Sequence, residues 1–270
     1  MRIPDNQGVA VVTEACSGVG ARYAKRLAER GYNLILSGAN GDRLERVAAA
    51  ATQVARRKVE LIVADLADPD QLAAMTMRFR SDCSIRLLVN NPDVSIASTL
   101  LHSEPHELAR MTALNTLAPM RVTSAIIPGF VSAGTGTIIN VASTQAFPPA
   151  SPEGVNGAMA AFLFAFSRSL RREFGNSGVR VQTVLACLAE PDTSAVPEAA
   201  TGVGMCAEDI VDAAMAGLDL REAVSIPSLH DLADWEAFEV ARETLCRNLR
   251  QSNPASRYGP EFTVKVVRPW

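Results

Sequence analysis

The stretch "TEACSGVG", residues 13–20, joins an apolar run to a helical pattern. The preceding "GVAVVT" (8–13) predicts a buried strand, and "VGARYAKRLAERG" (19–31) has the 3.6-residue spacing of an amphipathic helix. A glycine-containing turn between a strand and a helix is typical of a phosphate-binding loop, because backbone amides at the helix N-terminus point toward the anion. Glu14 is unexpected in such a loop, since its carboxylate would repel a phosphate.

The alternation of strand and helix patterns continues along the chain and predicts the fold class. Strict alternation favours a Rossmann-like α/β fold, a doubly wound parallel sheet of about seven strands with helices on both faces. We expect one domain over residues 1–270, in which 229–270 form a C-terminal helix and tail. The expected strands are 8–13, 33–38, 59–66, 85–91, 136–143, 179–186 and 223–227, and the expected helices are 19–31, 42–57, 68–80, 105–133, 151–175 and 207–218.

Composition and charge exclude several classes of partner. The 270 residues are 48% apolar and only 5% aromatic, which suits a sheet covered by helices, and the net charge of −3 provides no basic field for nucleic acid or for an anionic membrane. The five scattered cysteines indicate a reducing compartment. The start has no signal-peptide pattern, and the longest apolar run is too short to cross a bilayer. We therefore expect a soluble, cytoplasmic protein.

Five short motifs occur along the chain in the order "TEACSGVG", "ADL", "LLVNN", "ALNTLAP" and "GTIINVAS". Their sequences and their order resemble the short-chain dehydrogenase/reductase family across nearly the whole chain. "TEACSGVG" resembles its TGxxxGxG cofactor loop, "ADL" (64–66) its adenine-contacting turn, and "LLVNN" (87–91) the start of its NNAG motif. "ALNTLAP" and "GTIINVAS" carry the residues that match its active-site Asn and Ser. The resemblance implies that Asn115 and Ser143 are remnants of a catalytic set. If a dinucleotide binds, it implies contacts with Thr13, Ser17, Gly18, Gly20, Asp65 and Asn91.

The most consequential departure from the family concerns its Tyr-x-x-x-Lys pair. The Tyr hydroxyl transfers a proton, while the Lys lowers the pKa of that Tyr and holds the nicotinamide ribose. Here Val155 stands at the Tyr position and Met159 at the Lys position, and neither side chain transfers protons. Loss of a general acid typically costs about 10²–10⁴ in rate. No obvious substitute exists among the three tyrosines, Tyr23, Tyr32 and Tyr258.

Other departures affect the same cleft. Pro92 removes a backbone N–H from the NNAG motif, and Asp93 replaces a glycine that lets the cofactor approach. Ala186 and Cys187 replace the usual Pro-Gly pair after the sixth strand. At the end of the second strand, Ala39 stands where an Arg would bind a 2′-phosphate, and no acid is present there to accept the 2′-hydroxyl of NAD.

Glu14 weakens the phosphate site on simple electrostatic grounds. A carboxylate about 5 Å from a phosphate charge is repelled by roughly 3 kcal/mol at an effective dielectric near 20. That corresponds to about two orders of magnitude in affinity. A positive φ at Glu14 would cost on the order of 1 kcal/mol more. The alternative is that the side chain rotates into solvent and repels little.

Several polar residues have both a functional and an ordinary explanation. Ser143 and Asn115 line a ligand pocket, or else cap the strand end and bond backbone within the helix. Asp93 is a substitute acid or a turn residue. Glu153 follows Ser151 and Pro152 as a favourable acid at a helix start. We expect no metal, because Pro105 separates His102 from His106 on the helix, and we interpret Cys187 as a small apolar filler.

Three functions remain open from the sequence. The first is a small-molecule-binding or non-redox catalytic protein that uses the former active-site cleft. The second is a non-catalytic subunit that pairs with an active relative through helices 105–133 and 151–175. The third is a divergent NAD(P)-dependent oxidoreductase acting on a carbonyl or hydroxyl substrate. The expected cofactor is none or weakly bound NADP or NAD, and the expected assembly is a homodimer or homotetramer through the same helices.

Overall fold

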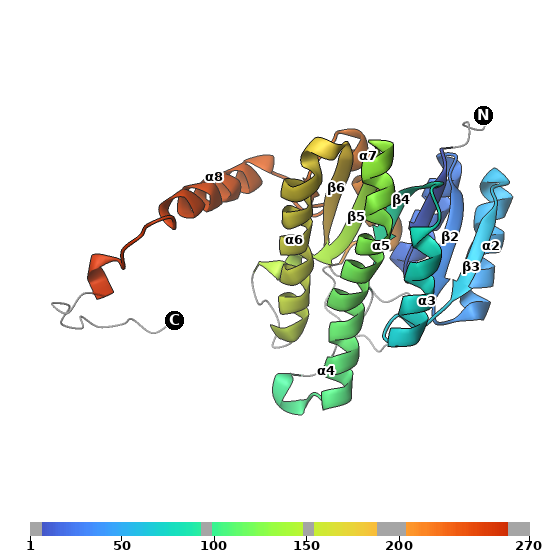
Figure 1. Ribbon diagram of the computed structural model, residues 1–270, viewed down its shortest axis with the longest axis horizontal. Helices are drawn as coiled ribbons and strands as arrows, with labels where there is room; N and C mark the ends of the chain where they lie inside the picture. The colour runs from blue at the N-terminus through green and yellow to red at the C-terminus, as the bar shows by residue number, and fades with distance from the viewer. Residues whose placement is uncertain (1–6, 93–98, 148–153, 188–203, 259–270) are drawn as a thin grey trace. The chain divides into compact units, whose positions relative to one another are not determined.

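The computed structural model describes residues 7–92, 99–147, 154–187 and 204–258, and these fall into two compact units divided after Ser228. Among the described residues of the first unit, seven parallel strands form one sheet in the order β3-β2-β1-β4-β5-β6-β7 (Figure 1). This sheet confirms the predicted Rossmann-like fold. Because β1 lies between β2 and β4, the strand order reverses there, and the carboxyl ends of these strands border the crevice where such folds bind ligands.

The helices and strands follow the predicted order along the chain. The strands are β1 (Val9–Val12), β2 (Asn33–Gly38), β3 (Val59–Val63), β4 (Ile85–Asn90), β5 (Gly136–Ser143), β6 (Val179–Ala186) and β7 (Val224–Ser225). The α-helices are α1 (Gly18–Glu29), α2 (Gly41–Ala55), α3 (Pro69–Arg80), α4 (Pro105–Thr112), α5 (Ala118–Ala133), α6 (Gly154–Phe174), α7 (Ala207–Asp219) and α8 (Leu232–Asn248).

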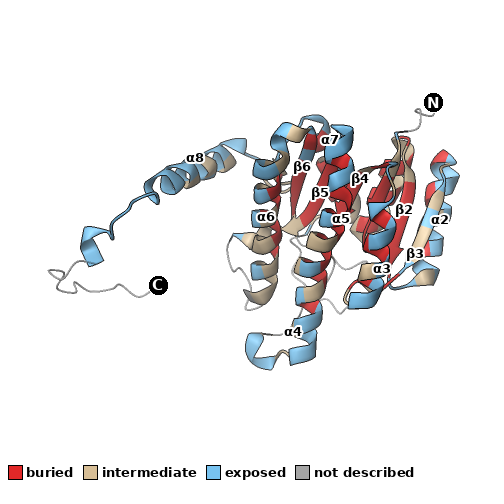
Figure 2. Ribbon diagram, in the orientation of Figure 1, coloured by how far each residue is buried: buried red, intermediate tan, exposed pale blue. Residues whose placement is uncertain are grey.

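Two apolar cores lie on opposite faces of the sheet. One contains side chains from α1, α2 and α7, and the other contains side chains from α3, α5 and α6. Apart from the edge strand β3, whose residues are half-buried or exposed, the longer strands are buried almost throughout. The helices turn a buried face to the sheet and an exposed face to solvent (Figure 2). This double coverage explains why the strand sequences are nearly continuous apolar runs rather than alternating patterns.

Several elements differ from the predicted bounds by one or two residues at an end, and three differ more clearly. β3 ends at Val63 rather than at residue 66, because the Asp65 carboxylate accepts a hydrogen bond from the Ala67 amide and turns the chain. β7 has two residues instead of five; Pro227 has no amide to extend its pairing. The helix predicted over 105–133 contains a π-helical turn, Ala113–Leu117, between α4 and α5.

The second unit contains α8 and a short 3₁₀ turn, Ser256–Tyr258. Asp231 caps α8 by accepting a hydrogen bond from the Ala233 amide, and no residue of α8 is buried. Within the described residues, none of the helices combines the length and the apolar character that a membrane span requires.

A buried polar network joins the centre of the sheet to two helices. Asn90 and Asn140 are neighbours in register, and the Asn90 side-chain amide donates to Asn140 Oδ1 (2.8 Å) and to Thr123 Oγ1 of α5 (3.1 Å). The Asn140 amide donates to Ser167 Oγ of α6 (2.8 Å). All four residues are almost fully buried, so each hydrogen bond replaces one that water would otherwise make. The network therefore fixes α5 and α6 against the strands that end at the crevice.

Replacement of Ser167 by Ala is expected to lower the free energy of unfolding by about 1–3 kcal/mol, because it leaves the buried Asn140 amide without its acceptor. Ser169→Ala is the matched control, since Ser169 also bonds the carbonyl four residues earlier but is exposed. Its effect should stay within about 0.5 kcal/mol. Urea denaturation followed by circular dichroism measures both, and equal losses would contradict the role assigned to the network.

Candidate functional site

The glycine loop is held to the end of β4 by a small hydrogen-bond network. Thr13 Oγ1 donates to the Val89 carbonyl (3.3 Å) and accepts from the Asn91 amide (3.1 Å). The Asn91 side chain donates to Ser17 Oγ (2.8 Å) and to the Glu14 carbonyl (3.2 Å). Thr13 and Asn91 are both buried, so these bonds are shielded from water. The loop therefore has a fixed shape without any ligand.

Close packing beneath the loop explains one of its glycines. A Cβ atom on Gly20 would collide with the Glu14 carbonyl oxygen and lie 2.9 Å from Ala15 Cα. Ser17 caps α1 by accepting from the Gly20 amide (3.0 Å). A Cβ on Gly18 would meet only Ala207 Cβ, at 3.4 Å, so the start of α7 borders this part of the loop. The backbone scaffold expected of a phosphate-binding loop is thus present.

Glu14 adopts a backbone conformation that favours glycine. Its φ is +46°, and it is one of three non-glycine residues with positive φ in the described part of the chain. The left-handed region costs an L-residue roughly 1–2 kcal/mol relative to glycine. A carboxylate and a strained backbone therefore occur together at Glu14, where the family's loop has a glycine.

The carboxylate of Asp65 is engaged by neighbours within the chain. Asp65 Oδ2 accepts from Arg110 Nη1 of α4 (2.6 Å), and Oδ1 accepts from the Ala67 amide (3.0 Å). Partial burial raises the pKa of this carboxyl, but the bonds from Arg110 and Ala67 outweigh burial, so that the pKa is lowered overall. A ligand that uses Asp65 would therefore compete with an existing ion pair.

The two remnants of the catalytic set lie in different local environments. Ser143 ends β5, is half-buried, and accepts a hydrogen bond from the Gln145 amide (3.2 Å), so it caps the 3₁₀ turn Thr144–Ala146. Asn115 is buried within the π-helical turn between α4 and α5. Such turns are frequent at functional sites because the extra residue re-aims the side chains around it.

The first turns of α6 place aliphatic and thioether groups where the family has proton-transfer groups. Val155 and Met159 are four residues apart, and both are half-buried. A Cβ on Gly157 would lie 2.9 Å from the Gln145 carbonyl oxygen, so α6 begins close against the segment that follows Ser143. Neither side chain carries a proton that it could donate near neutral pH.

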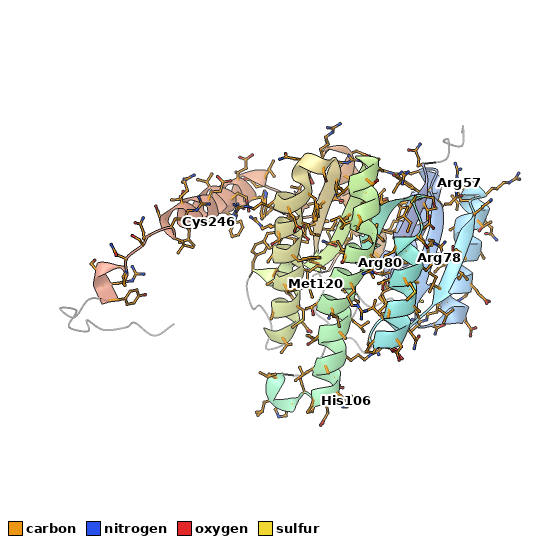
Figure 3. The ribbon with its side chains drawn as sticks, in the orientation of Figure 1. Arg57, Arg78, Arg80, His106, Met120 and Cys246 are labelled. Atoms are coloured by element: carbon orange, nitrogen blue, oxygen red, sulfur yellow. The ribbon has the colours of Figure 1, made fainter. Side chains whose placement is uncertain are left out.

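Neither tyrosine of the first unit replaces the missing donor at this edge of the sheet. Tyr23 is fully buried in α1, where burial raises the pKa of its hydroxyl, and Tyr32 lies just before β2, at the amino end of the strands. Tyr258 belongs to the second unit. The imidazole of His106 is at the outer end of α4 (Figure 3). In the described ranges no group of three or more His, Cys, Asp or Glu side chains could hold a metal ion.

Comparison with known proteins identifies the family. The family model described as short chain dehydrogenase matches residues 8–199. The chain belongs to this family. It is 35% identical to a short-chain dehydrogenase from Sphingobium yanoikuyae whose structure contains NADPH, with a TM-score of 0.89 over 93% of this chain and 100% of that one. It is 34% identical to the bulky-bulky ketone specific alcohol dehydrogenase from Comamonas testosteroni, with a TM-score of 0.87 over 94% of this chain and 100% of that one.

One human relative has a name that states a lack of activity. The chain is 29% identical over 178 residues to the human protein named inactive hydroxysteroid dehydrogenase-like protein 1, an alignment that covers 65% of this chain and 54% of that protein. The chain thus spans about half the length of this relative. The family therefore includes a protein whose name states that it is inactive.

The residues present do not fit the family's usual use of NAD(P). The loop backbone could hold a phosphate, but Glu14 adds a like charge, Asp65 is paired with Arg110, and Pro92 offers no amide. Val155 and Met159 supply neither proton transfer nor a ribose contact. We therefore assign this chain no reaction step that passes through a dinucleotide.

Some site residues were missed by sequence reasoning, and others lie outside the described residues. Arg110 is 45 positions from Asp65, and nothing in the sequence marks the two as partners. Cys16 Sγ donates to the Asn40 carbonyl (3.3 Å), and burial raises the pKa of its thiol. Asp93 and the segments 148–153 and 188–203, with the helix start expected at Ser151, are not among the described residues.

Replacing Glu14 by Gly should raise the free energy of unfolding by up to about 1 kcal/mol, because glycine adopts a φ of +46° without strain. The control is Glu14→Gln, which removes the charge but keeps the Cβ and should change stability by less than about 0.5 kcal/mol. Thermal and urea denaturation of the two variants provide the measurement. Equal stabilisation by both would show that charge, rather than backbone strain, is the cost at this position.

The ion pair at Asp65 predicts a pH effect of defined sign. Because the folded-state pKa is lowered, its stabilising contribution is present above the ordinary Asp pKa of about 3.9 and is lost as pH falls through the lower folded value. Arg110→Gln should raise the Asp65 pKa toward its ordinary value, while Arg110→Lys should raise it less. Carboxyl titration by NMR measures this, and an unchanged pKa in Arg110→Gln would contradict the pairing.

Proposed function

We propose that this chain is a short-chain dehydrogenase-fold protein that has lost ordinary hydride transfer and uses its cleft to bind a small molecule or to catalyse a non-redox reaction. The proposal places the ligand at the carboxyl ends of the strands, where folds of this type bind ligands, between the glycine loop and the start of α6. Asn115 and Ser143 are the polar groups that the proposal assigns to the ligand. The Asn115 amide and the Ser143 hydroxyl suit a neutral oxygen-bearing ligand better than an anion, since neither group carries a charge.

The observation that carries the proposal is the pair Val155 and Met159. A short-chain dehydrogenase must deliver a proton to the substrate oxygen as hydride transfers, and the family's resemblance assigns that task to a Tyr supported by a Lys. The two replacements are half-buried on the first turns of α6. The proposal assigns them to an apolar wall of the ligand site. Apolar walls with a few polar groups are typical of small-molecule sites.

Changes at the nucleotide end support the same proposal independently. Repulsion between Glu14 and a phosphate is worth roughly 3 kcal/mol at about 5 Å and an effective dielectric near 20. Asp65 must also give up its 2.6 Å bond to Arg110 before it can serve another donor. Losses at the nucleotide end and at the proton donor concern different steps, yet both reduce the same activity. The human relative named inactive provides a precedent within the family.

Calorimetric titration of the purified full chain with NADP⁺, NADPH, NAD⁺ and NADH tests the proposal. We expect no binding at millimolar concentration, and a gain of up to about 100-fold in NADPH affinity on Glu14→Gly as the repulsion is removed. Micromolar binding to the unmodified chain, together with oxidation of NADPH by a ketone, would overturn it. The double variant Val155→Tyr and Met159→Lys, combined with Glu14→Gly, shows whether only these chemical groups are missing.

The binding half of the proposal has its own measurement. A panel of neutral ketones, alcohols and lactones is screened by thermal shift against the full chain and against Ser143→Ala. A ligand of the cleft should raise the Tm of the unmodified chain and lose at least part of this effect in the variant. If no compound shifts the Tm and no dinucleotide binds, small-molecule binding is refuted and a non-catalytic role remains.

A divergent oxidoreductase is the second candidate, and one observation favours it. The intact network among Thr13, Asn91 and Ser17 preserves the loop geometry of a cofactor-binding family whose Sphingobium member was solved with NADPH. In that case a water molecule or Asp93 would supply the proton. The dinucleotide titration separates the two candidates directly. Assembly through residues 105–133 and 151–175, alone or with an active relative, stays a prediction, as does a cytoplasmic location.

A further inference from the structure

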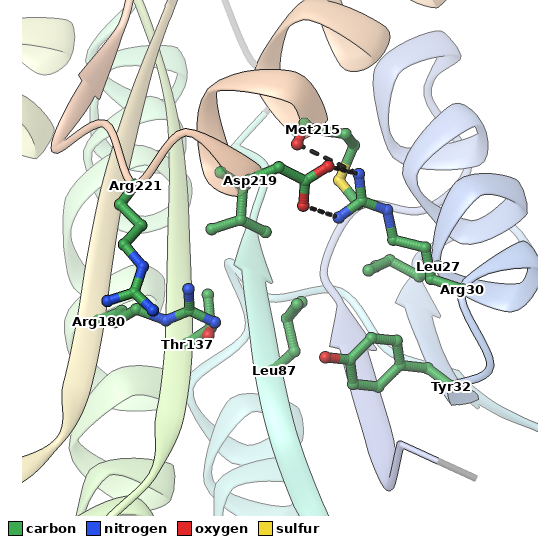
Figure 4. A pocket seen from close by; sticks show the side chains of 10 residues that line it. Leu27, Arg30, Tyr32, Leu87, Thr137, Arg180, Met215, Asp219 and Arg221 are labelled. Atoms are coloured by element: carbon green, nitrogen blue, oxygen red, sulfur yellow. Dashed lines mark hydrogen bonds and ion pairs between the residues drawn. The ribbon is translucent and has the colours of Figure 1, made fainter. Parts of the chain in front are cut away.

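A second hollow lies at the opposite edge of the sheet, near the amino ends of β4, β5 and β6. Its volume is about 250 Å³, and it is remote from the carboxyl-end cleft because parallel strands direct their two ends to opposite edges. Figure 4 shows its lining side chains. They come from α1, α7 and the three strands, together with the turns after α1 and α7: Leu27, Arg30, Tyr32, Leu87, Thr137, Arg180, Met215, Leu218, Asp219 and Arg221.

The floor of this cavity is built by a row of residues in register. Leu87 pairs with Thr137, and Thr137 pairs with Arg180, so the three neighbours project from the same face of adjacent strands. Leu27 and Leu218 close the bottom of the cavity from α1 and α7, and both are almost fully buried. The surface open to a ligand is therefore mainly polar, with the Thr137 hydroxyl and the Arg180 guanidinium among its groups.

The rim carries an excess of positive charge. Three arginines and one aspartate line the cavity, a net charge of +2. Arg30 donates two hydrogen bonds to Asp219 (2.8 and 2.7 Å), which compensates that carboxylate. Arg180 and Arg221 have no carboxylate within 4.0 Å among the residues that the structure describes, and Figure 4 shows their guanidinium groups on the same side of the cavity, across from the Arg30–Asp219 pair.

The backbone at Arg221 gives a second, independent indication. Arg221 follows the end of α7 with a φ of +62°, where its amide bonds the Leu218 carbonyl (3.2 Å) and the Glu222 amide bonds the Gly217 carbonyl (2.9 Å). Helix ends of this kind favour glycine. Strained backbone conformations are common at functional sites. Here the strained residue, Arg221, also has a charged side chain that lines the cavity.

We propose that this cavity binds a phosphate monoester with a small organic body, the phosphate lying between Arg180 and Arg221. A phosphate monoester carries about −1.5 to −2 charges near pH 7, which matches the net charge of the lining. Arginine's planar fork suits phosphate oxygens. The volume lies below the roughly 300–1,000 Å³ of drug-sized sites, so the body is about one ring in size. The site is independent of the cleft function proposed above.

Titration of the full chain with phenyl phosphate, followed by calorimetry and NMR, tests the site. Phenyl phosphate should bind at least tenfold more tightly than benzyl alcohol, which lacks the charge. Benzoate should bind more weakly than phenyl phosphate because it carries a single charge. Affinity should fall as salt is added. Binding of phenyl phosphate no tighter than that of benzyl alcohol would refute the phosphate site.

Two variants and one control keep the test independent of folding. Arg221→Gly and Arg180→Gln should each weaken phenyl phosphate binding at least tenfold, and Arg221→Gly should not lower the Tm, because glycine accepts a φ of +62° without strain. Arg56→Gly is the control, since Arg56 is exposed after α2 with a φ of +49° and does not line the cavity. It should leave binding unchanged. Undiminished binding in both cavity variants would overturn the proposal.

Discussion

Two hydrogen bonds donated by the side-chain amide of Asn91 hold the elements around the crevice together. It reaches from the end of β4 to the Glu14 carbonyl and to Ser17, and so joins the loop after β1 to the neighbouring strand at the point where strand order reverses. The same hydroxyl of Ser17 then accepts from the Gly20 amide and begins α1. Because these groups are shielded from solvent, breaking one bond leaves buried polar atoms without partners, and the loop, strand and helix hold one another in place.

This arrangement separates the scaffold from the chemistry. The residues that shape the loop, Thr13, Asn91 and Gly20, bond or pack against other parts of the chain. Glu14, Val155 and Met159 differ from the family's pattern. Glu14 lines a small pocket at the ends of β1 and β4, and Val155 and Met159 are half-buried on the first turns of α6. A fold can therefore retain the family's form while its function changes, since function depends on the site rather than on the architecture.

The sequence was sufficient for the architecture because strand and helix patterns alternate with distinct periods and clear caps. Asp68 and Pro69 marked the start of α3 correctly, and β2, β5 and β6 have the predicted bounds. The sequence could not supply the pairing of Arg110 with Asp65, since two charges 45 residues apart carry no periodic signal. The cavity at the amino edge was missed for the same reason, because Arg180 and Arg221 become neighbours only through the register of β6 and the turn after α7.

The short length of β7 affects whether copies of the chain aggregate through this edge of the sheet. A free strand at the border of a sheet offers its amides and carbonyls to any extended peptide that approaches, which is a common start of insoluble assemblies. With only Val224 and Ser225 in ladder geometry, that border presents too few groups to recruit another polypeptide. At the far border, Glu60 of β3 is tied to Arg78, and charged side chains placed there discourage unwanted growth of the sheet.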